Sequence, residues 1–140
     1  MPRRVLVDTG PLVAILSRGD EHHGACVKVL RQLPGPLFTC WPVITEAAWL
    51  LRKRPDTVAR MFEGFTGGLF ALLPLTNDDL PGVAAMMKRY DSAGLQLADA
   101  ALAHLAEREN IRSVFTTDRR DFSIIRLKRN RTLKLIPNIQ

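Results

Sequence analysis

Four acidic side chains stand where secondary-structure elements are expected to begin or end. They are Asp8 in VLVDTGP, Glu46 in WPVITEAAW, Asp99 in LQLADAALAHLAE and Asp118 in SVFTTDRRDF. The chain carries a net charge of +6, so solubility is a poor explanation for acids at strand ends and inside apolar helical faces. All-oxygen ligands favour Mg²⁺ or Mn²⁺ over zinc. A divalent-metal site in a basic protein indicates chemistry on nucleic acid.

Each acid also has a purely structural interpretation. Asp8 follows an apolar run, a common place for a turn or capping residue, and Asp118 with Asp121 fits a turn in TTDRRDF. Glu46 shares a helical face with apolar residues, although a flanking position would be ordinary. Asp99 has alanines and leucines on both sides, which is a poor setting for an unpaired charge. Taken singly, Asp8 and Asp118 favour the structural interpretation; taken together, the four acids favour a site.

Apolar runs and helical patterns alternate along the chain. Runs without polar alternation predict five buried strands, at 5–7, 37–39, 69–75, 113–116 and 133–136. A first helix is expected to end at Leu16, with Thr9 as its N-cap. A third begins at Pro42 and must end before Pro55. The other expected helices are at 22–33, 57–65, 76–90 and 96–109. The pattern predicts one domain over residues 1–140, of class α/β. Its architecture is three-layer α/β/α, with a central parallel sheet and helices on both faces.

This architecture explains how the four acids can meet. Ligands of open parallel sheets bind outside the carboxyl ends of the strands. Asp8 and Asp118 follow two strands, and Asp99 and Glu46 are expected near helix starts, which lie at the same edge in a βα unit. Two carboxylates 5 Å apart repel by roughly 3 kcal/mol at an effective dielectric constant near 20. A divalent cation would remove that penalty, and helix N-termini would help to keep two of the acids charged.

Composition sets limits on partners and location. The pI near 10.0 reflects 20 Lys and Arg against 14 Asp and Glu, which favours a polyanionic partner such as RNA, although a role in solubility alone stays open. Cys26 and Cys40 lack metal-type spacing and fit buried, reduced thiols. No stretch is long enough to span a membrane, and no leader-type cleavage site follows the N-terminal apolar run, so we expect no membrane contact and a cytoplasmic protein.

The ordered set of motifs resembles a known family. VLVDTGPLVAIL, a glutamate on a helix, LADAALAHLAE and VFTTDRRDF follow one another as in PIN-domain ribonucleases. Within that family the chain is similar to the VapC-like toxins of bacterial and archaeal toxin–antitoxin pairs. The resemblance runs from Val5 to Ile136, and the DTG and TTDRRDF segments carry most of it. The chain departs from the family pattern at two places. Many members have an acid or Ser at the position of Gln96, and the segment that corresponds to 91–94 often contains an acid and a Pro.

The resemblance implies specific roles. Asp8, Glu46, Asp99 and Asp118 would be both the catalytic and the metal-binding acids, with Mg²⁺ or Mn²⁺ as cofactor. Thr116 matches the family's hydroxyl beside the site, and it is grouped here with the candidate substrate-binding residues Arg119 and Arg120. Implied partners are an RNA substrate, a second copy of the chain in a homodimer, and an antitoxin whose Arg or Lys could displace the metal.

Two other functions are compatible with parts of the sequence. A catalytically silent module that binds RNA or protein through its basic surface is the main alternative, although all four acids are present. A phosphoacceptor signalling domain would also have acids at strand ends. It would need an acidic pair after the first strand and a late lysine, for which Lys134 is the one candidate.

Two further surface features are open to more than one interpretation. The basic segment 126–134 is typical of a solvated face, but it could also track a phosphate backbone. Apolar residues are crowded between 41 and 75, and one small domain is not expected to bury all of them: Trp41, Trp49, Phe62, Phe65 and Phe70. A leftover apolar patch would mark an interface, whereas complete burial would make them all core.

Overall fold

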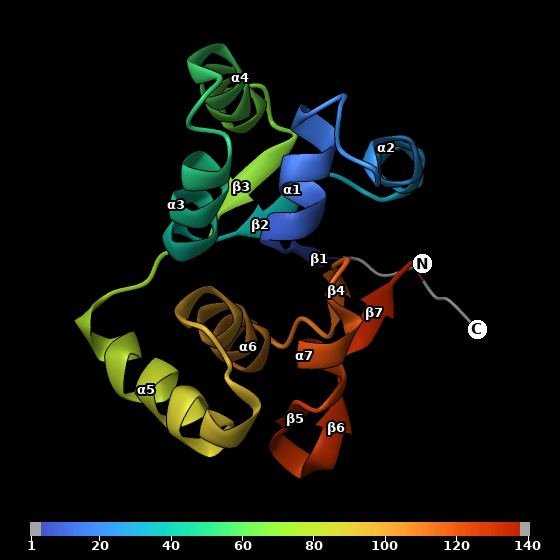
Figure 1. Cartoon of the computed structure of the whole chain (residues 1–140). Coiled ribbons are helices and arrows are strands. Elements are labelled where there is room, and N and C mark those ends of the chain that lie inside the picture. The colour runs from blue at the N-terminus through green and yellow to red at the C-terminus, as the bar shows by residue number, and fades with distance from the viewer. Residues whose placement is uncertain (1–3, 138–140) are drawn as a thin grey trace.

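A five-stranded parallel sheet forms the centre of the protein, in a computed structural model that describes residues 4–137. Its strand order is β3-β2-β1-β4-β7 (Figure 1). The strands are β1 (Val5–Val7), β2 (Leu37–Thr39), β3 (Phe70–Leu72), β4 (Ser113–Phe115) and β7 (Lys134–Ile136). All five strands predicted from the sequence are present, and the predicted parallel α/β/α class is confirmed.

The two central strands end side by side. β1 pairs in parallel with β4, with Val7 opposite Phe115, and the Asp8 backbone N–H donates to the Phe115 carbonyl at 2.9 Å. Every residue of these two strands is buried, which explains their uninterrupted apolar runs. The residues that follow β1 and β4 therefore emerge together at the carboxyl edge, as the sequence predicted.

Helices cover both faces of this sheet. The chain moves outward from β1 to β3 and then returns across the sheet to β4, so right-handed crossovers place α5 and α6 on the face opposite α1–α4, as Figure 1 shows. The helices are α1 (Thr9–Leu16), α2 (His23–Gln32), α3 (Trp41–Leu50), α4 (Pro55–Thr66), α5 (Leu80–Arg89), α6 (Leu97–Glu109) and α7 (Arg119–Ser123). Among the described residues no helix has the length and apolar character needed to cross a membrane.

Several helix boundaries differ from expectation. Pro55 does not close α3, which ends at Leu50; it is the first residue of α4, where its missing N–H costs no hydrogen bond. Asp8, not Thr9, is the N-cap of α1. Glu46 lies in the middle of α3, so the N-terminus of that helix does not support its charge. Asn110 does end α6 in the left-handed conformation, with φ 54°, as predicted.

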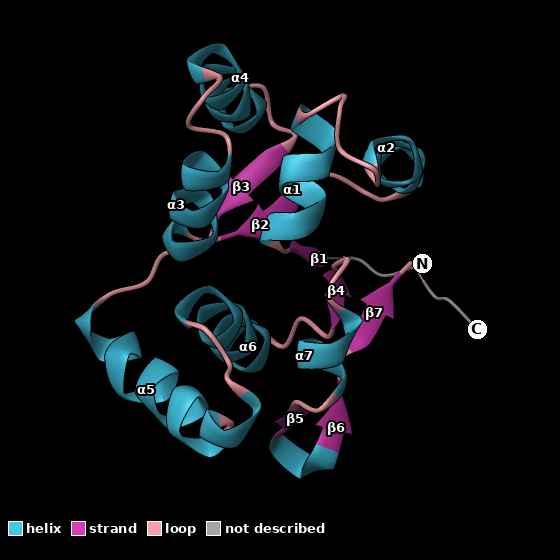
Figure 2. Cartoon of the chain, in the orientation of Figure 1, coloured by secondary structure: helices cyan, strands magenta, loops and turns pink. Residues whose placement is uncertain are grey.

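The segment after β4 contains structure that the sequence did not indicate. The short helix α7 leads into an antiparallel hairpin of β5 (Arg126–Leu127) and β6 (Arg131–Thr132). Figure 2 shows the two strands next to α7, and the turn Lys128–Asn130 joins them. The basic segment is therefore folded as a hairpin before the chain enters β7.

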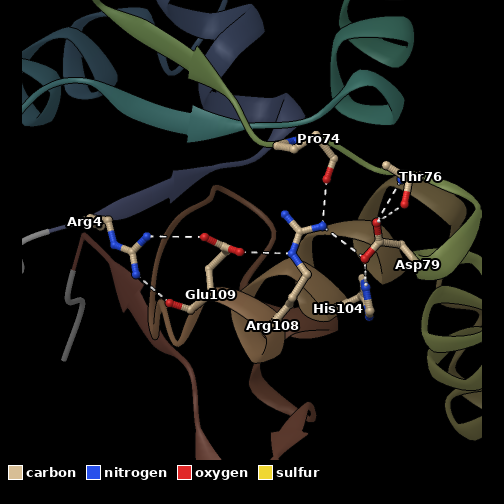
Figure 3. A network of polar contacts seen from close by, with 7 residues as sticks. All are labelled: Arg4, Pro74, Thr76, Asp79, His104, Arg108 and Glu109. Carbon is tan, nitrogen blue, oxygen red and sulfur yellow. Dashed lines mark hydrogen bonds and ion pairs between the residues drawn. The ribbon is translucent and has the colours of Figure 1, made fainter.

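A polar network fixes α6 against the segment between β3 and α5 (Figure 3). The buried Asp79 carboxylate accepts the Thr76 backbone N–H at 2.8 Å, lies 2.8 Å from His104 Nε2 and accepts from Arg108 Nη1 at 3.0 Å. Arg108 also donates to the Pro74 carbonyl at 2.7 Å. These contacts, led by the Thr76 N–H, hold the pKa of Asp79 well below its usual range. The network thus fixes the position of α6, the helix that carries Asp99.

Candidate active site

Asp8 directly follows β1, and its side chain is held in place by Thr116, which directly follows β4. The Thr116 hydroxyl donates to Asp8 Oδ2 at 2.9 Å and accepts the Asp118 backbone N–H at 2.9 Å. Asp8 is 5% exposed and Thr116 is 1% exposed. Thr116 therefore joins the segments after both central strands. Because its hydroxyl is occupied by protein groups, it acts on the acids rather than reaching outward.

Burial changes the ionisation of Asp8. Loss of hydration raises the pKa of this carboxyl to about 7, and hydrogen bonds from the Thr9 backbone and the Thr116 hydroxyl offset part of that rise. The negative charges of Asp99 and Glu46 raise it further. Asp8 thus feels the charges of two other predicted site residues, one from each of two helices.

Asp99 occupies the first turn of α6, as predicted. Its Oδ2 accepts the Gln96 backbone N–H at 3.2 Å, which completes a capping box with the Gln96 side chain. Burial raises the pKa of Asp99 to about 6 although this backbone hydrogen bond opposes the rise, and the charges of Asp121, Asp118 and Glu46 add to it. Gln96, where the family pattern often has an acid, therefore contributes a cap and no charge.

The other two predicted acids are open to solvent. Glu46 projects from α3 and is largely exposed. The part of its side chain that is buried loses hydration, which raises the pKa of its carboxyl. Asp118 is the exposed N-cap of α7, and its Oδ1 accepts the Asp121 backbone N–H at 3.3 Å. The structure thus brings the four acids to one edge as two buried carboxylates, Asp8 and Asp99, with two exposed ones beside them.

A fifth acid joins this group. The sequence allows Asp121 to be a peripheral fifth acid and favours a turn-capping role for it, but it is Asp118 that caps the turn. The Asp121 charge is the largest of those that raise the pKa of Asp99. Burial and the Asp118 carboxylate raise the pKa of Asp121 itself. The three-residue spacing of 118 and 121, one turn of a helix, was the available signal.

The two candidate substrate-binding arginines differ in their freedom. Arg119 Nη1 donates to the Pro137 carbonyl at 2.5 Å, which directs this side chain toward β7. Arg120 is exposed at the start of α7, next to Asp118 and Asp121. Arg120 is therefore the arginine next to the acids, whereas Arg119 already has a protein partner.

The carboxylate set fits a hard divalent cation with bound water. Among residues 4–137, no group of three or more His, Cys, Asp or Glu side chains is arranged to hold a metal ion directly. Mg²⁺ commonly keeps several water ligands and binds through only one or two carboxylates. Burial raises the pKa values of Asp8 and Asp99, with like charges adding to the rise, and a bound cation would relieve both costs of their ionisation. The oxygen donors and their charge thus fit Mg²⁺ or Mn²⁺, with water completing the shell.

Close packing beside Asp8 leads to a prediction for Gly10. A Cβ at this position would lie 2.1 Å from Thr117 Oγ1, so Gly10→Ala must displace the side chain of Thr117, the residue after Thr116. We expect a loss of about 1–3 kcal/mol in unfolding free energy, measured by urea denaturation. The double variant Gly10→Ala with Thr117→Ala should recover it, because Thr117 Cβ is 3.5 Å away.

Gly24 provides the matched control. It lies in α2, and a Cβ there meets nothing within 4 Å. Gly24→Ala should therefore stabilise the protein by about 0.5–1 kcal/mol. If Gly10→Ala behaves in the same way, the contact with Thr117 does not constrain the edge.

Comparisons with known proteins show the family of this chain. Residues 5–128 match the family model of the PIN domain. The chain belongs to the PIN domain family. It is 26% identical over 124 residues to Ribonuclease VapC26 of Mycobacterium tuberculosis (strain ATCC 25618 / H37Rv), covering 87% of this chain and 92% of that protein.

Solved PIN-like toxins share the fold. The crystal structure of Mycobacterium tuberculosis VapC20, described as a sarcin–ricin loop cleaving toxin, matches with a TM-score of 0.76 at 19% identity, over 83% of this chain and 91% of that one. A toxin–antitoxin complex from Klebsiella pneumoniae matches with 0.65 at 19% identity, over 86% and 92%. VapBC2 from Rickettsia felis, bound to promoter DNA, matches with 0.63 at 14% identity, over 94% and 96%.

Proposed function

We propose that this PIN-domain protein is a metal-dependent endoribonuclease and the toxin of a toxin–antitoxin pair. The observation that carries the proposal is the pair of buried carboxylates, Asp8 and Asp99, whose pKa values rise to about 7 and about 6 at the carboxyl edge of the sheet. Ionisable groups perturbed by burial and by like charges cluster at functional sites. The names of the relatives, a ribonuclease and a loop-cleaving toxin, support RNA as the substrate.

Each residue at the acid cluster would have its own role. Asp8 and Asp99 would hold Mg²⁺ or Mn²⁺, with Thr116 fixing the orientation of Asp8. A cation bound there would supply Lewis-acid activation of water and neutralise charge at the phosphodiester. Glu46 and Asp118, being exposed, would bind through water or accept a proton from the attacking water molecule. Arg120 would contact the RNA backbone beside them.

Cleavage of RNA is the direct test. Purified protein in Mg²⁺ or Mn²⁺ should cut total RNA into discrete fragments, and EDTA should stop the reaction. Restoring the metal should restore the cleavage pattern. Intact RNA under all three conditions would leave a catalytically silent RNA- or protein-binding module as the better description.

An antitoxin is the proposed protein partner. Two of the structural relatives are toxin–antitoxin assemblies. A basic side chain from such a partner would compete with metal for Asp8 and Asp99 through charge-assisted hydrogen bonds. Purifying the protein together with the product of a neighbouring small reading frame should abolish cleavage, and unchanged cleavage would remove this partner.

A homodimer is proposed on the exposed apolar face around α3 and α6. Trp41, Trp49 and Leu97 are 57%, 63% and 53% exposed. Two adjoining hollows of about 300 and 500 Å³ share Trp41, Pro42 and Leu97. Trp49 and the candidate site residue Glu46 line only the larger one. Among the other aromatic residues between 41 and 75, Phe70 is buried and Phe65 packs against the core. These two residues therefore belong to the core and not to an exposed patch.

Substitution of Trp41 should separate the dimer. The wild-type protein is expected at twice the chain mass of 15.7 kDa by light scattering, and Trp41→Glu at the monomer mass, since a charge cannot be buried unpaired in an apolar interface. Phe62→Glu is the matched control, because Phe62 is 43% exposed on α4, away from this face. A monomeric wild-type protein would contradict the dimer.

A further inference from the structure

We infer that the hairpin β5–β6 and the residue pair that follows it, residues 126–134, form a docking site for the RNA backbone outside the acid cluster; this basic hairpin rests on the proposed function. Its five cations account for five of the chain's net charge of +6, and no Asp or Glu occurs after Asp121. The remainder of the chain is thus nearly neutral. The cations are Arg126, Lys128, Arg129, Arg131 and Lys134.

The hairpin presents its cations on a supported frame. Leu127 and Leu133 are buried, whereas Arg126, Lys128 and Lys134 are exposed, so apolar residues face the core and charges face solvent. Within residues 4–137, none of the five cations is in an ion pair. Arg126 donates to the Ser123 and Ile125 carbonyls and Arg131 to the Lys128 carbonyl, so in the described part of the chain the side chains without a partner are those of Lys128, Arg129 and Lys134. Exposed charges on a fixed frame bind a polyanion without a large ordering cost.

Two backbone hydrogen bonds attach the hairpin to the end of α5 and to the last turns of α6. The Arg126 N–H donates to the Tyr90 hydroxyl at 2.9 Å, and the Lys128 N–H donates to the Glu107 carboxylate at 2.8 Å. Tyr90 follows α5, and Glu107 belongs to α6, the helix of Asp99. The hairpin is thus held at a fixed place relative to the acids.

The turn of the hairpin has an arginine at a position whose backbone conformation favours glycine or asparagine. Arg129 has φ 63° and Asn130 has φ 57°, values that suit Gly or Asn in tight hairpin turns. Asn130 is an ordinary choice, but Arg129 is costly for the fold. An exposed cation kept in an unfavourable backbone conformation is explained by use of its side chain.

The position of the hairpin favours RNA over an acidic protein as its ligand. Only two residues separate α7 from β5, and α7 begins with Arg119 and Arg120 beside Asp118. Figure 1 shows the hairpin extending from the end of α7. A phosphodiester chain leaving the acids past Arg120 would run along α7 to the hairpin. It would reach Lys134 last, because Lys134 begins β7 opposite Ser113, at the amino end of β4. Phosphate contacts of this kind are independent of base sequence.

Salt-dependent binding tests this inference separately from catalysis. Anisotropy of a long fluorescein-labelled oligo(U) is measured in EDTA, where cleavage is not required, over a range of salt concentrations. Arg129→Gly should lower the slope of log K against log salt by about 0.7–0.9, the value of one phosphate contact. The same variant should melt at a higher temperature, because glycine relieves the positive φ, so weaker binding cannot be attributed to misfolding.

A stronger variant and a matched control complete the experiment. Lys128→Gln, Arg129→Gly and Arg131→Gln together should weaken binding of long oligo(U) on the order of tenfold to a hundredfold at low salt. A short oligo(U) that spans only the acids should bind both proteins alike. Lys53→Gln with Arg54→Gln, exposed between α3 and α4, should leave the salt slope almost unchanged.

The outcomes separate the two proposals. An unchanged slope and affinity in the triple variant overturn the basic hairpin as an RNA site, whether or not the wild-type protein cleaves RNA. If the triple variant instead loses only the protein product of the neighbouring reading frame, the ligand is an acidic protein and the inference is wrong. Failure of the wild-type protein to cut total RNA counts against the nuclease proposal alone.

Discussion

Asp99→Asn should reduce RNA cleavage on the order of 10³–10⁴-fold while leaving the protein folded. The variant removes the charge that would hold the cation. It keeps an oxygen that can accept the Gln96 N–H, so the start of α6 stays capped. Asp8→Asn should act similarly, because an amide oxygen can still accept the Thr116 hydroxyl. Cleavage of total RNA in Mg²⁺, with thermal unfolding as the folding control, measures both.

Asp91→Asn is the comparison for this loss. Asp91 is an exposed acid in the turn before α6, and its substitution removes the same charge without touching Asp8 or Asp99. It should cleave RNA like the wild-type protein. Asp121→Asn should fall between the two, because its charge acts on Asp99 from a peripheral position. Full activity in Asp99→Asn would remove this residue from the catalytic group.

The sheet could be predicted because its strands are buried on both faces. A strand such as Val5–Val7 is then a continuous apolar run, and the residue after it marks the carboxyl edge. That reasoning was enough to place Asp8 and Asp118 together. It was enough for Asp99 also, since the capping position fixes that side chain at the start of α6.

Features set by tertiary contacts could not be predicted in the same way. Glu46 reaches the edge from mid-helix, so its placement depends on how α3 packs and not on a local signal. The basic hairpin has strands of two residues and an arginine at the turn, so it lacks both the length and the glycine that indicate a hairpin. The contact between Gly10 and Thr117 joins segments more than a hundred residues apart, and no spacing in the sequence reveals it.

Asp8 should make the metal-free protein less stable as the pH rises. Its pKa is raised from 3.8 to about 7 in the folded state, so the folded protein binds more protons than the unfolded chain between those values. Stability therefore falls across this interval, and the whole penalty is present above pH 7. At 1.36 kcal/mol for each pH unit, the shift corresponds to about 4 kcal/mol. Asp99, with its pKa raised to about 6, contributes in the same direction.

Asp8→Asn should accordingly stabilise the metal-free protein at pH 8, by about 2–4 kcal/mol in urea denaturation with EDTA, and by much less at pH 5. Glu63→Gln removes an exposed charge on α4 and should have little effect at either pH. If Asp8→Asn is no more stable than the wild-type protein at pH 8, the ionised Asp8 carboxylate does not destabilise the folded state.

Mg²⁺ should reverse this penalty in the wild-type protein. At a hundredfold excess over its dissociation constant, a ligand that binds only the folded state stabilises it by about 2.7 kcal/mol. Protons compete with the cation for Asp8, so the stabilisation by a fixed Mg²⁺ concentration should be larger at pH 8 than at pH 6. Asp8→Asn should lose most of this response, whereas Glu63→Gln should keep it. Equal stabilisation of Asp8→Asn and wild type by Mg²⁺ would show that the cation binds elsewhere, because the response would then be independent of the buried carboxylate.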